Sequence, residues 1–331
     1  MAKFKQYVLP VAIVLGFLLH DHCVSLSFLV PILIFSILLL SFVAVDIRHL
    51  RPTMFDLGLI VYQIVVGVGL FAVLSLCGVD KIIAEGVMMG ALTPVAASST
   101  VVACMLGANR ERVTTFAIVG NISMAVVTPV VFTLIGDHPE LSLVNSYMLM
   151  MAKIGSVLAL PFFLALILQI WLPKVNDVLA KRTNWSYYIW AIALLLTLGQ
   201  TIHYILTQGE GQWSNIIWLS SLSLLFCIFQ FWFGRKYGRR YHDIIGGAQM
   251  MGQKNSAMGI WMVNTFLYSP LSSVFMAFYS VWQNLWNAWQ LRRVKTVCST
   301  TVAGRDQRSG RKVCSTTVAG RDQRSGRKFK G

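Results

Sequence analysis

Charged side chains are scarce in this chain. Of its 331 residues, 12% are Asp, Glu, Lys or Arg, whereas 56% are hydrophobic and the mean hydropathy is +0.65. A soluble domain is about one quarter charged and about half apolar, so this composition excludes an ordinary soluble enzyme and a disordered chain. Apolar runs instead recur along the chain, each near the ~20 residues that a helix needs to cross a bilayer. We therefore expect a polytopic membrane protein.

Several motifs of enzyme chemistry are also missing. The sequence has no Walker loop, no G-x-S-x-G nucleophile motif and no H-E-x-x-H zinc motif, so neither ATP-driven transport within this chain nor intramembrane proteolysis is supported. The six cysteines form no C-x-x-C pair, and a free thiol in an apolar segment acts as a small hydrophobic group. We expect no enzyme activity, no cofactor and no disulfide or zinc framework.

Hydropathy and helix-breaking residues predict ten membrane-spanning helices. Their expected ranges are 6–20, 25–45, 55–77, 82–107, 112–135, 145–172, 185–206, 213–234, 241–267 and 270–291. The first segment has a basic start and a short apolar stretch, so a signal peptide is the alternative there. No small-x-small cleavage site precedes Ser25, which favours a helix that stays in the protein.

Lysine and arginine alternate between the two ends of these segments. Thirteen of them lie at the N-terminus and in every second link, whereas the opposite links hold Lys81 alone. Because positive residues are retained on the cytoplasmic side, this asymmetry predicts that both termini are cytoplasmic. We expect an integral protein of a bacterial inner (plasma) membrane, in contact with membrane lipid.

The basic end of the chain is separate from the predicted helices. Residues 292–331 hold 12 Lys+Arg and 2 acids, which accounts for +10 of the formal net charge of +15. The segment VCSTTVAGRDQRSGRK at 297–312 is repeated unchanged at 313–328, and two polar copies are too few to bury a core of their own. We expect a disordered cytoplasmic arm beside anionic lipid and no nucleic-acid partner.

Two of the ten segments are interrupted at corresponding places. The fourth is broken at Thr93–Pro94, and the ninth is loosened by Gly246–Gly247 and Gly252. Paired, broken spans in two halves of five indicate an inverted-repeat secondary transporter, because unwound backbone at membrane depth must be covered by protein or by a watery cavity. Ordinary kinks are the alternative, since glycine and proline are common in membrane helices.

Short motifs lie at and after both breaks. Residues 94–100 read PVAASST, and Thr128–Pro129 lies in the next segment. Residues 252–256 read GQKNS, and residues 279–284 read YSVWQN. In order and spacing these motifs resemble those of the bile acid:sodium symporter family, which read roughly P-G-G-T-A-S-N, L-T-P, G-M-Q-N-S and F-S-V-W-H-N. The resemblance extends over about residues 5–290.

The resemblance implies an all-α transmembrane domain over residues 1–291, with ten helices in a 5+5 inverted repeat. A core domain would cover about 55–135 and 213–291, and a panel domain about 6–45 and 145–206. The discontinuous fourth and ninth helices would cross near the middle of the membrane. Members of the family carry organic anions, such as bile acids or small carboxylates, between panel and core, usually with two sodium ions.

The sodium ligands of that family are not kept here. Aligned without gaps, the glutamate of the ninth helix falls on Met250, and the glutamine of the second sodium site falls on Lys254. The remaining ligand positions fall on Ser99, Thr100, Val113, Ala117 and Tyr62, with Gln63 adjacent to the last. Sodium is a hard cation that needs several oxygen ligands. We therefore expect degenerate sodium sites, no other bound metal and sodium-independent transport.

Lys254 is the most informative of these positions. An ammonium at membrane depth costs at least ~2.5–3.5 kcal/mol and is normally functional. At the crossing it could stand in for the second sodium ion, with carbonyls of the broken helix ends as its partners. Two alternatives stay open. The amine could face the cavity and pair with the substrate or titrate as a proton-coupling group, or it could extend to the membrane interface.

Other polar residues near the breaks are candidates for lining the site. Hydroxyls just after Pro94 could face an anionic group at the start of a half-helix, or they could pack helices together. The candidates of this kind are Ser98, Ser99, Thr100, Asn121, Ser123, Asn255 and Ser256.

A separate histidine-rich triplet, His20-Asp21-His22, suggests a metal or proton site. We expect instead a wet external loop, because the sequence indicates no further ligand nearby. We likewise expect no metal or proton site at His203, near the outer end of the seventh segment.

Together these observations predict a secondary active transporter for an organic anion that works by alternating access. A proton-coupled or exchange carrier for a keto acid or pantoate is one alternative, and a non-transporting membrane sensor with the same fold is another. The substrate itself stays open, because the shape of a binding cavity depends on side chains of both domains and a fold does not determine its ligand.

Overall fold

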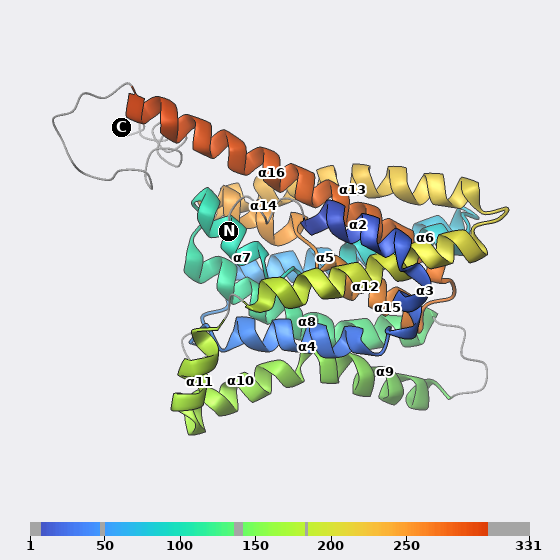
Figure 1. Ribbon diagram of the computed structural model, residues 1–331, viewed down its shortest axis with the longest axis horizontal. Coiled ribbons are helices and arrows are strands. Elements are labelled where there is room, and N and C mark those ends of the chain that lie inside the picture. Colours follow the sequence, from blue (N-terminus) through green and yellow to red (C-terminus); the bar gives the residue numbers. More distant parts are fainter. Residues whose placement is uncertain (1–7, 47–49, 136–141, 183–184, 304–331) are drawn as a thin grey trace, which may run out of the picture.

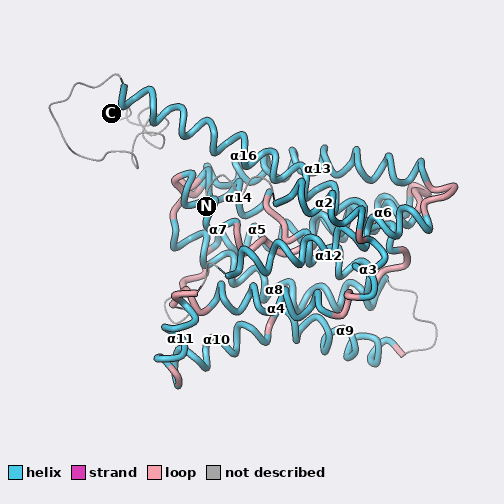
Figure 2. The backbone as a smooth tube through the Cα atoms, in the orientation of Figure 1, coloured by secondary structure: helices cyan, strands magenta, loops and turns pink. Residues whose placement is uncertain are grey.

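The structure is a computed structural model that describes residues 8–46, 50–135, 142–182 and 185–303. These residues form helices joined by short links, and none of them lies in a β-strand (Figure 2). The longest helices lie side by side and run across the view of Figure 1. The described part of the chain is therefore all-α.

Four helices are long and apolar enough to cross a membrane. They are α5 (Met54–Leu76), α8 (Arg110–Ile135), α12 (Trp185–Gln208) and α13 (Trp213–Arg240). The pair α9 (Leu143–Leu158) and α10 (Leu160–Trp171), bent by 45° at its break, counts as a fifth. The prediction of an all-α integral membrane protein is thereby confirmed.

Shorter helices occupy the other predicted segments and their links. They are α2 (Val8–Leu18), α3 (His20–Ser25), α4 (Leu29–Phe42), α6 (Lys81–Leu92), α7 (Ser99–Leu106), α11 (Pro173–Ala180), α14 (Ile244–Gly252), α15 (Ser256–Phe266) and the 3-10 turn η2 (Pro270–Ser272), followed by the long α16 (Ser273–Ala303).

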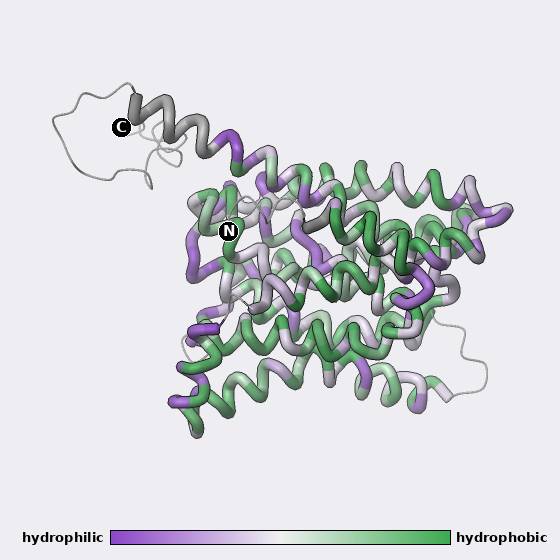
Figure 3. The backbone as a smooth tube through the Cα atoms, in the orientation of Figure 1, coloured by the Kyte–Doolittle hydropathy of each residue, from purple (hydrophilic) through white to green (hydrophobic). Residues whose placement is uncertain are grey.

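The outer surface of the bundle is apolar. Figure 3 shows hydrophobic residues along the lengths of the helices and hydrophilic residues mainly toward their ends. Large side chains such as Met54, Leu76, Leu134 and Trp171 are each more than 70% exposed. A soluble monomer rarely exposes so much apolar surface, whereas lipid is a suitable neighbour for it because every helix satisfies its own backbone hydrogen bonds.

Two predicted spans are interrupted. The first is split into α6 and α7 by the link 93–98, where Pro94 lacks a backbone N–H and disfavours the helical conformation of Thr93 before it. The second is split into α14 and α15 at residues 253–255, where Gln253 takes an extended conformation. Both interruptions fall in the segments where the sequence predicts them.

The two adjacent glycines of α14 have a different role from the one we expect. Gly246 and Gly247 lie inside an intact helix, and a Cβ on Gly247 would lie 2.3 Å from the carbonyl oxygen of Gly234 in α13. Gly247 allows α13 and α14 to pack backbone against backbone, a use of small residues that is typical of membrane helices. Gly246 instead leaves room for the side chain of Asp243, which caps α14. The prediction that the two glycines loosen the helix is wrong, and the chain leaves the helix only after Gly252.

Two helix boundaries also differ from the predicted ones. The segment 145–172 is bent between α9 and α10, because Pro161 in the first turn of α10 has no N–H to continue the hydrogen-bond pattern of α9. At the other end of the chain, α16 continues past 291 to Ala303 and projects beyond the bundle (Figure 1). Residues 292–303, predicted as the start of a disordered arm, are therefore helical, and 304–331 lie outside the described residues.

Candidate functional site

The interruptions of the two broken spans lie against each other. Val95 and Lys254 form an antiparallel bridge between them. The N–H of Asn255 donates to the carbonyl of Pro94 at 2.9 Å. Unwound backbone therefore finds part of its hydrogen bonding in the opposite break, which meets the requirement that polar backbone at membrane depth has protein partners.

Lys254 is fully buried at this meeting point. Its side chain is 0% exposed, and its Nζ donates to the carbonyl oxygen of Ala91 at 2.9 Å. Ala91 lies in the last turn of α6, where carbonyls have no helical partner and the helix dipole is negative. Among the described residues no carboxylate lies within ion-pair distance of this ammonium. The amine thus points to a helix end and not to the membrane interface.

The backbone of Lys254 is held by a residue that we did not predict. Gln283 in α16 accepts from the N–H of Lys254 at 2.7 Å, and its Nε2 donates to the carbonyl of the same residue at 3.0 Å. In the same helix, Tyr279 donates its hydroxyl to the carbonyl of Gly252 at 2.9 Å. Both side chains belong to the motif YSVWQN, so this motif fastens α16 to the second break.

Further glutamines continue from the break along α14. Gln253 donates to the side-chain oxygen of Gln249, and Gln249 Nε2 donates to Oε1 of Gln290 in α16 at 2.7 Å. We did not predict this row of glutamines from the sequence. The spacing of four between Gln249 and Gln253 could have indicated it, because it places both side chains on one face of a helix.

The hydroxyls after Pro94 are used within their own turn. Ser99 is buried and donates to the carbonyl of Ala96 at 2.6 Å, and Thr100 donates to that of Ala97 at 3.1 Å. Ser98 is exposed. These bonds stabilise the start of α7. They also use the hydroxyl protons of Ser99 and Thr100, so neither hydroxyl can donate to an anion unless the turn rearranges.

A small cavity lies where α4 meets α7 and α8. Its volume is about 30 Å³, enough for roughly one water molecule. Asn121 borders it together with Thr100 and Ser41. The Asn121 amide donates to the carbonyls of Ala117 at 2.5 Å and of Val95 at 3.5 Å, whereas its Oδ1 is buried without a hydrogen-bond partner in the described structure. Asn121 therefore connects α8 to the first break and keeps one acceptor free.

The other predicted residues of the second break take structural positions. The side chain of Asn255 caps α15 by accepting from the N–H of Met258 at 3.3 Å. Ser256 is buried, and its N–H donates to the carbonyl of Lys254 at 2.9 Å. Ser123 is half-buried on α8, two residues beyond Asn121, so helical periodicity turns it away from the face that Asn121 presents.

The positions that correspond to sodium ligands are mostly apolar and packed. Met250, Val113 and Ala117 belong to one hydrophobic cluster, against which Tyr62 also packs. The ring of Tyr62 stacks on Phe233 with 3.7 Å between ring centroids. A thioether and two alkyl side chains offer sodium no oxygen ligand, and Tyr62 adds a single neutral hydroxyl. The residues present at these positions therefore do not make up the set of several oxygens that a sodium ion needs.

Gln63 is placed differently from its neighbour Tyr62. It is only 1% exposed, and its Nε2 has no hydrogen-bond partner among the described residues. It lies one turn before Gly67, whose missing Cβ makes room for Leu92 at the end of α6. Since residues four apart share a helix face, Gln63 faces the neighbourhood of the first break with an unused donor.

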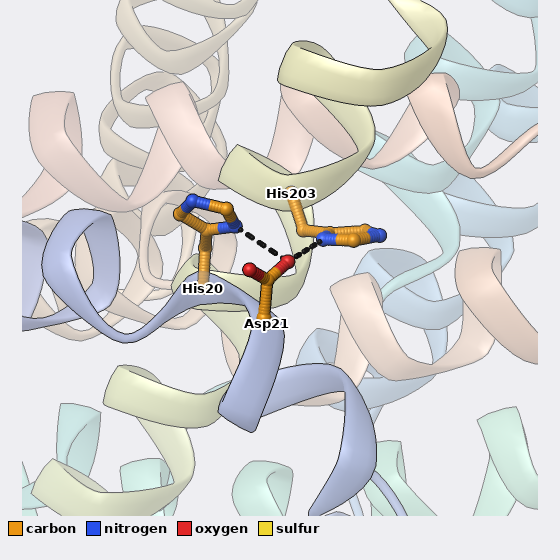
Figure 4. Close-up of side chains that lie close together, drawn as sticks. All are labelled: His20, Asp21 and His203. Atoms are coloured by element: carbon orange, nitrogen blue, oxygen red, sulfur yellow. Dashed lines mark hydrogen bonds and ion pairs between the residues drawn. The ribbon is translucent and has the colours of Figure 1, made fainter.

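The histidine triplet is not the loop that we predicted. His20–Ser25 forms the short helix α3, and His203 of α12 lies against Asp21 (Figure 4). The Nδ1 of His203 is 2.9 Å and the Nδ1 of His20 is 3.0 Å from the same oxygen, Asp21 Oδ1. The expectation that no further ligand lies nearby is wrong, because the partner is 182 residues away along the chain.

Comparison with known proteins adds no relative. A search against protein-family models finds no match, and a search of curated proteins finds none either. The resemblance to the bile acid:sodium symporters therefore depends on the motifs in the sequence.

Proposed function

We propose that this protein is a secondary transporter of an organic anion, similar to the bile acid:sodium symporters. In this proposal the ten helices form two inverted halves of five, and α6–α7 and α14–α15 are the discontinuous fourth and ninth helices. Both termini are cytoplasmic, and the membrane is a bacterial inner membrane. The observation that carries the proposal is the buried Lys254 at the meeting point of two interrupted apolar spans.

The amine of Lys254 acts in this proposal as a tethered cation. A buried ammonium is costly at membrane depth, by at least ~2.5–3.5 kcal/mol, so a chain that needed only packing here would be more stable with a neutral residue. The carbonyl of Ala91 and the negative end of α6 are the kind of partners that otherwise coordinate a bound cation. The ammonium thus supplies the charge that relatives of the proposed family take from sodium.

The same proposal makes transport independent of sodium. The cluster of Met250, Val113 and Ala117 supports this, because it fills the expected ligand positions with apolar groups. The fixed positive charge of Lys254 attracts an anionic substrate in every transport cycle, so no sodium ion has to bind before the substrate. The energy for transport then comes from the gradient of the substrate itself, from exchange against another solute or from coupling to protons.

Alternating access requires one group of helices to move against another. The cavity beside Asn121 lies between α4, in the proposed panel, and α7 with α8, in the proposed core. At about 30 Å³ it is far smaller than an organic anion, which fits a closed conformation that opens on one side to admit the substrate. Gln63 then contributes an unused donor, its Nε2, and Asn121 contributes an unused acceptor, its Oδ1.

Uptake into proteoliposomes tests the proposal. Bile salts, sulfated steroids and small carboxylates are supplied one at a time, and saturable uptake of at least one of them is expected. Lys254→Gln should lower that uptake at least tenfold, whereas Lys153→Gln should leave it within about twofold, because Lys153 is exposed on α9. Binding of an anion without any flux would contradict transport and favour the sensor.

A further inference from the structure

Three side chains converge at α3 (Figure 4), which lies at the end of the bundle opposite α11 and α14 in Figure 1. His20 and Asp21 come from the start of α3, and His203 comes from α12 (Figure 4). One ligand atom from each lies within 4.8 Å of the other two. The two imidazoles are 27% and 23% exposed and the carboxylate is 74% exposed, so the cluster is open to water on one side.

The distances in this cluster suit coordination by one ion. Two ligands at about 2.1 Å from a metal are about 3 Å apart when their bonds to it meet at right angles, as in octahedral coordination. The two Nδ1–Oδ1 distances are 2.9 and 3.0 Å. The His203 contact is also a good hydrogen bond. The Nδ1 of His20 is nearly as close to Asp21 Oδ1, but it is buried and makes no hydrogen bond of good geometry in the described residues. An ion between the three atoms would satisfy it.

We infer that His20, Asp21 and His203 form a binding site for a divalent transition metal of the zinc, cobalt or nickel class. Imidazole nitrogen together with one carboxylate is the ligand set of such ions, whereas calcium and magnesium prefer oxygen ligands throughout. Water completes the coordination on the exposed side. Lys81 is the single basic residue in the links predicted for this end of the molecule, so little positive charge opposes a cation here.

The bound ion would connect α3 to α12. These two elements already pack closely, since Gly199 of α12 leaves room for Cys23 of α3. A metal held by residues from both would stabilise this contact and fix the outer end of α2, α3 and α12 as one unit. The site is independent of the crossing at Lys254, so the inference does not depend on the proposed transport.

Cobalt binding tests this inference on the purified, full-length, untagged protein in detergent after chelator treatment. We expect one Co²⁺ per chain, detected by its visible absorption and displaced by Zn²⁺ but not by Ca²⁺. His203→Gln and Asp21→Asn should each weaken binding at least tenfold. His22→Gln is the matched control, because His22 lies exposed on the same helix outside the cluster, and it should bind as the wild type does.

Thermal unfolding with and without Zn²⁺ gives a second readout for each variant. The ion should raise the Tm of the wild type and of His22→Gln, and it should leave that of His203→Gln unchanged. Because each variant is compared with itself, a variant of lower stability stays informative. The inference would be overturned if the wild type bound no Co²⁺, if His203→Gln bound it equally well, or if Ca²⁺ displaced it. The cluster would then be only a hydrogen-bonded contact between α3 and α12.

Discussion

At the scale of single residues, the proposed function depends on Lys254. Its ammonium is bonded to the carbonyl of Ala91, and its backbone is held on both sides by Gln283. The amine therefore has little freedom to leave the break while α16 stays in place. In the proposed transport cycle, a tethered charge differs from a bound ion because it cannot dissociate.

Replacing Gln283 with leucine should destabilise the protein. The substitution leaves the buried N–H of Lys254 without its side-chain acceptor, whereas the carbonyl still accepts from Ser256. An unsatisfied buried polar group costs about 1–3 kcal/mol. We expect a lower Tm of the purified protein in detergent. Asn284→Leu is the control, since within the described residues Asn284 Nδ2 donates to a carbonyl of its own helix alone, that of Ser280 at 2.7 Å. An equal loss in both variants would show that Gln283 has no special role in holding the break.

At the scale of elements, close helix packing depends on glycines that meet backbone atoms. Gly234 and Gly238 of α13 face Gly247 of α14 so closely that a Cβ would collide with main-chain atoms. Backbone atoms cannot move aside as a flexible side chain can, so a larger residue must separate the helices. The second break lies at the end of α14, and its position therefore depends on this contact.

Gly247→Ala should lower stability by about 1–3 kcal/mol through overpacking. Gly69→Ala in α5 is the matched control, because a Cβ there meets nothing within 4 Å, and alanine favours a helix by roughly 0.5–1 kcal/mol over glycine. The Tm of Gly247→Ala should therefore fall below that of the wild type, whereas the Tm of Gly69→Ala should rise or stay unchanged. A neutral Gly247→Ala would contradict the packing described here.

Features that depend on a residue and its neighbours in sequence could be predicted. Features that depend on contacts between distant segments could not. Pro94 breaks its span because its own ring forbids the helix, so the sequence alone indicates the position. Gly247 has the same local signature as a loosened helix, but its role depends on α13 as a partner. The contact of His203 with Asp21 joins residues 182 positions apart, and no periodicity within either segment reveals it. Gln283 could have been suspected from its motif, but its bonds to Lys254 depend on the position of α16.

At the scale of the whole molecule, the basic residues predict an orientation. The basic loops include those beside α11 and α14, which lie at one end of the bundle in Figure 1, whereas α3 lies at the other. Cys77, at the end of α5, has an exposed thiol. It belongs to a link that the distribution of Lys and Arg assigns to the outside.

Labelling of intact cells with a membrane-impermeant maleimide checks this orientation. Cys77 should react from outside, and Cys77→Ser should abolish the signal. In the Cys77→Ser background, Val178→Cys places a thiol on the exposed surface of α11, and it should react only after the membrane is opened. The reverse pattern would mean that the chain lies in the membrane the other way round.

The central claim is that a permanently attached amine has replaced a mobile ion in the transport cycle. Its most direct test is the initial rate of uptake of one transported anion into proteoliposomes, measured in sodium chloride and in choline chloride at equal ionic strength. The account predicts equal rates in the two salts for the wild type and a low rate in both for Lys254→Gln. Uptake by the wild type that requires sodium would contradict it.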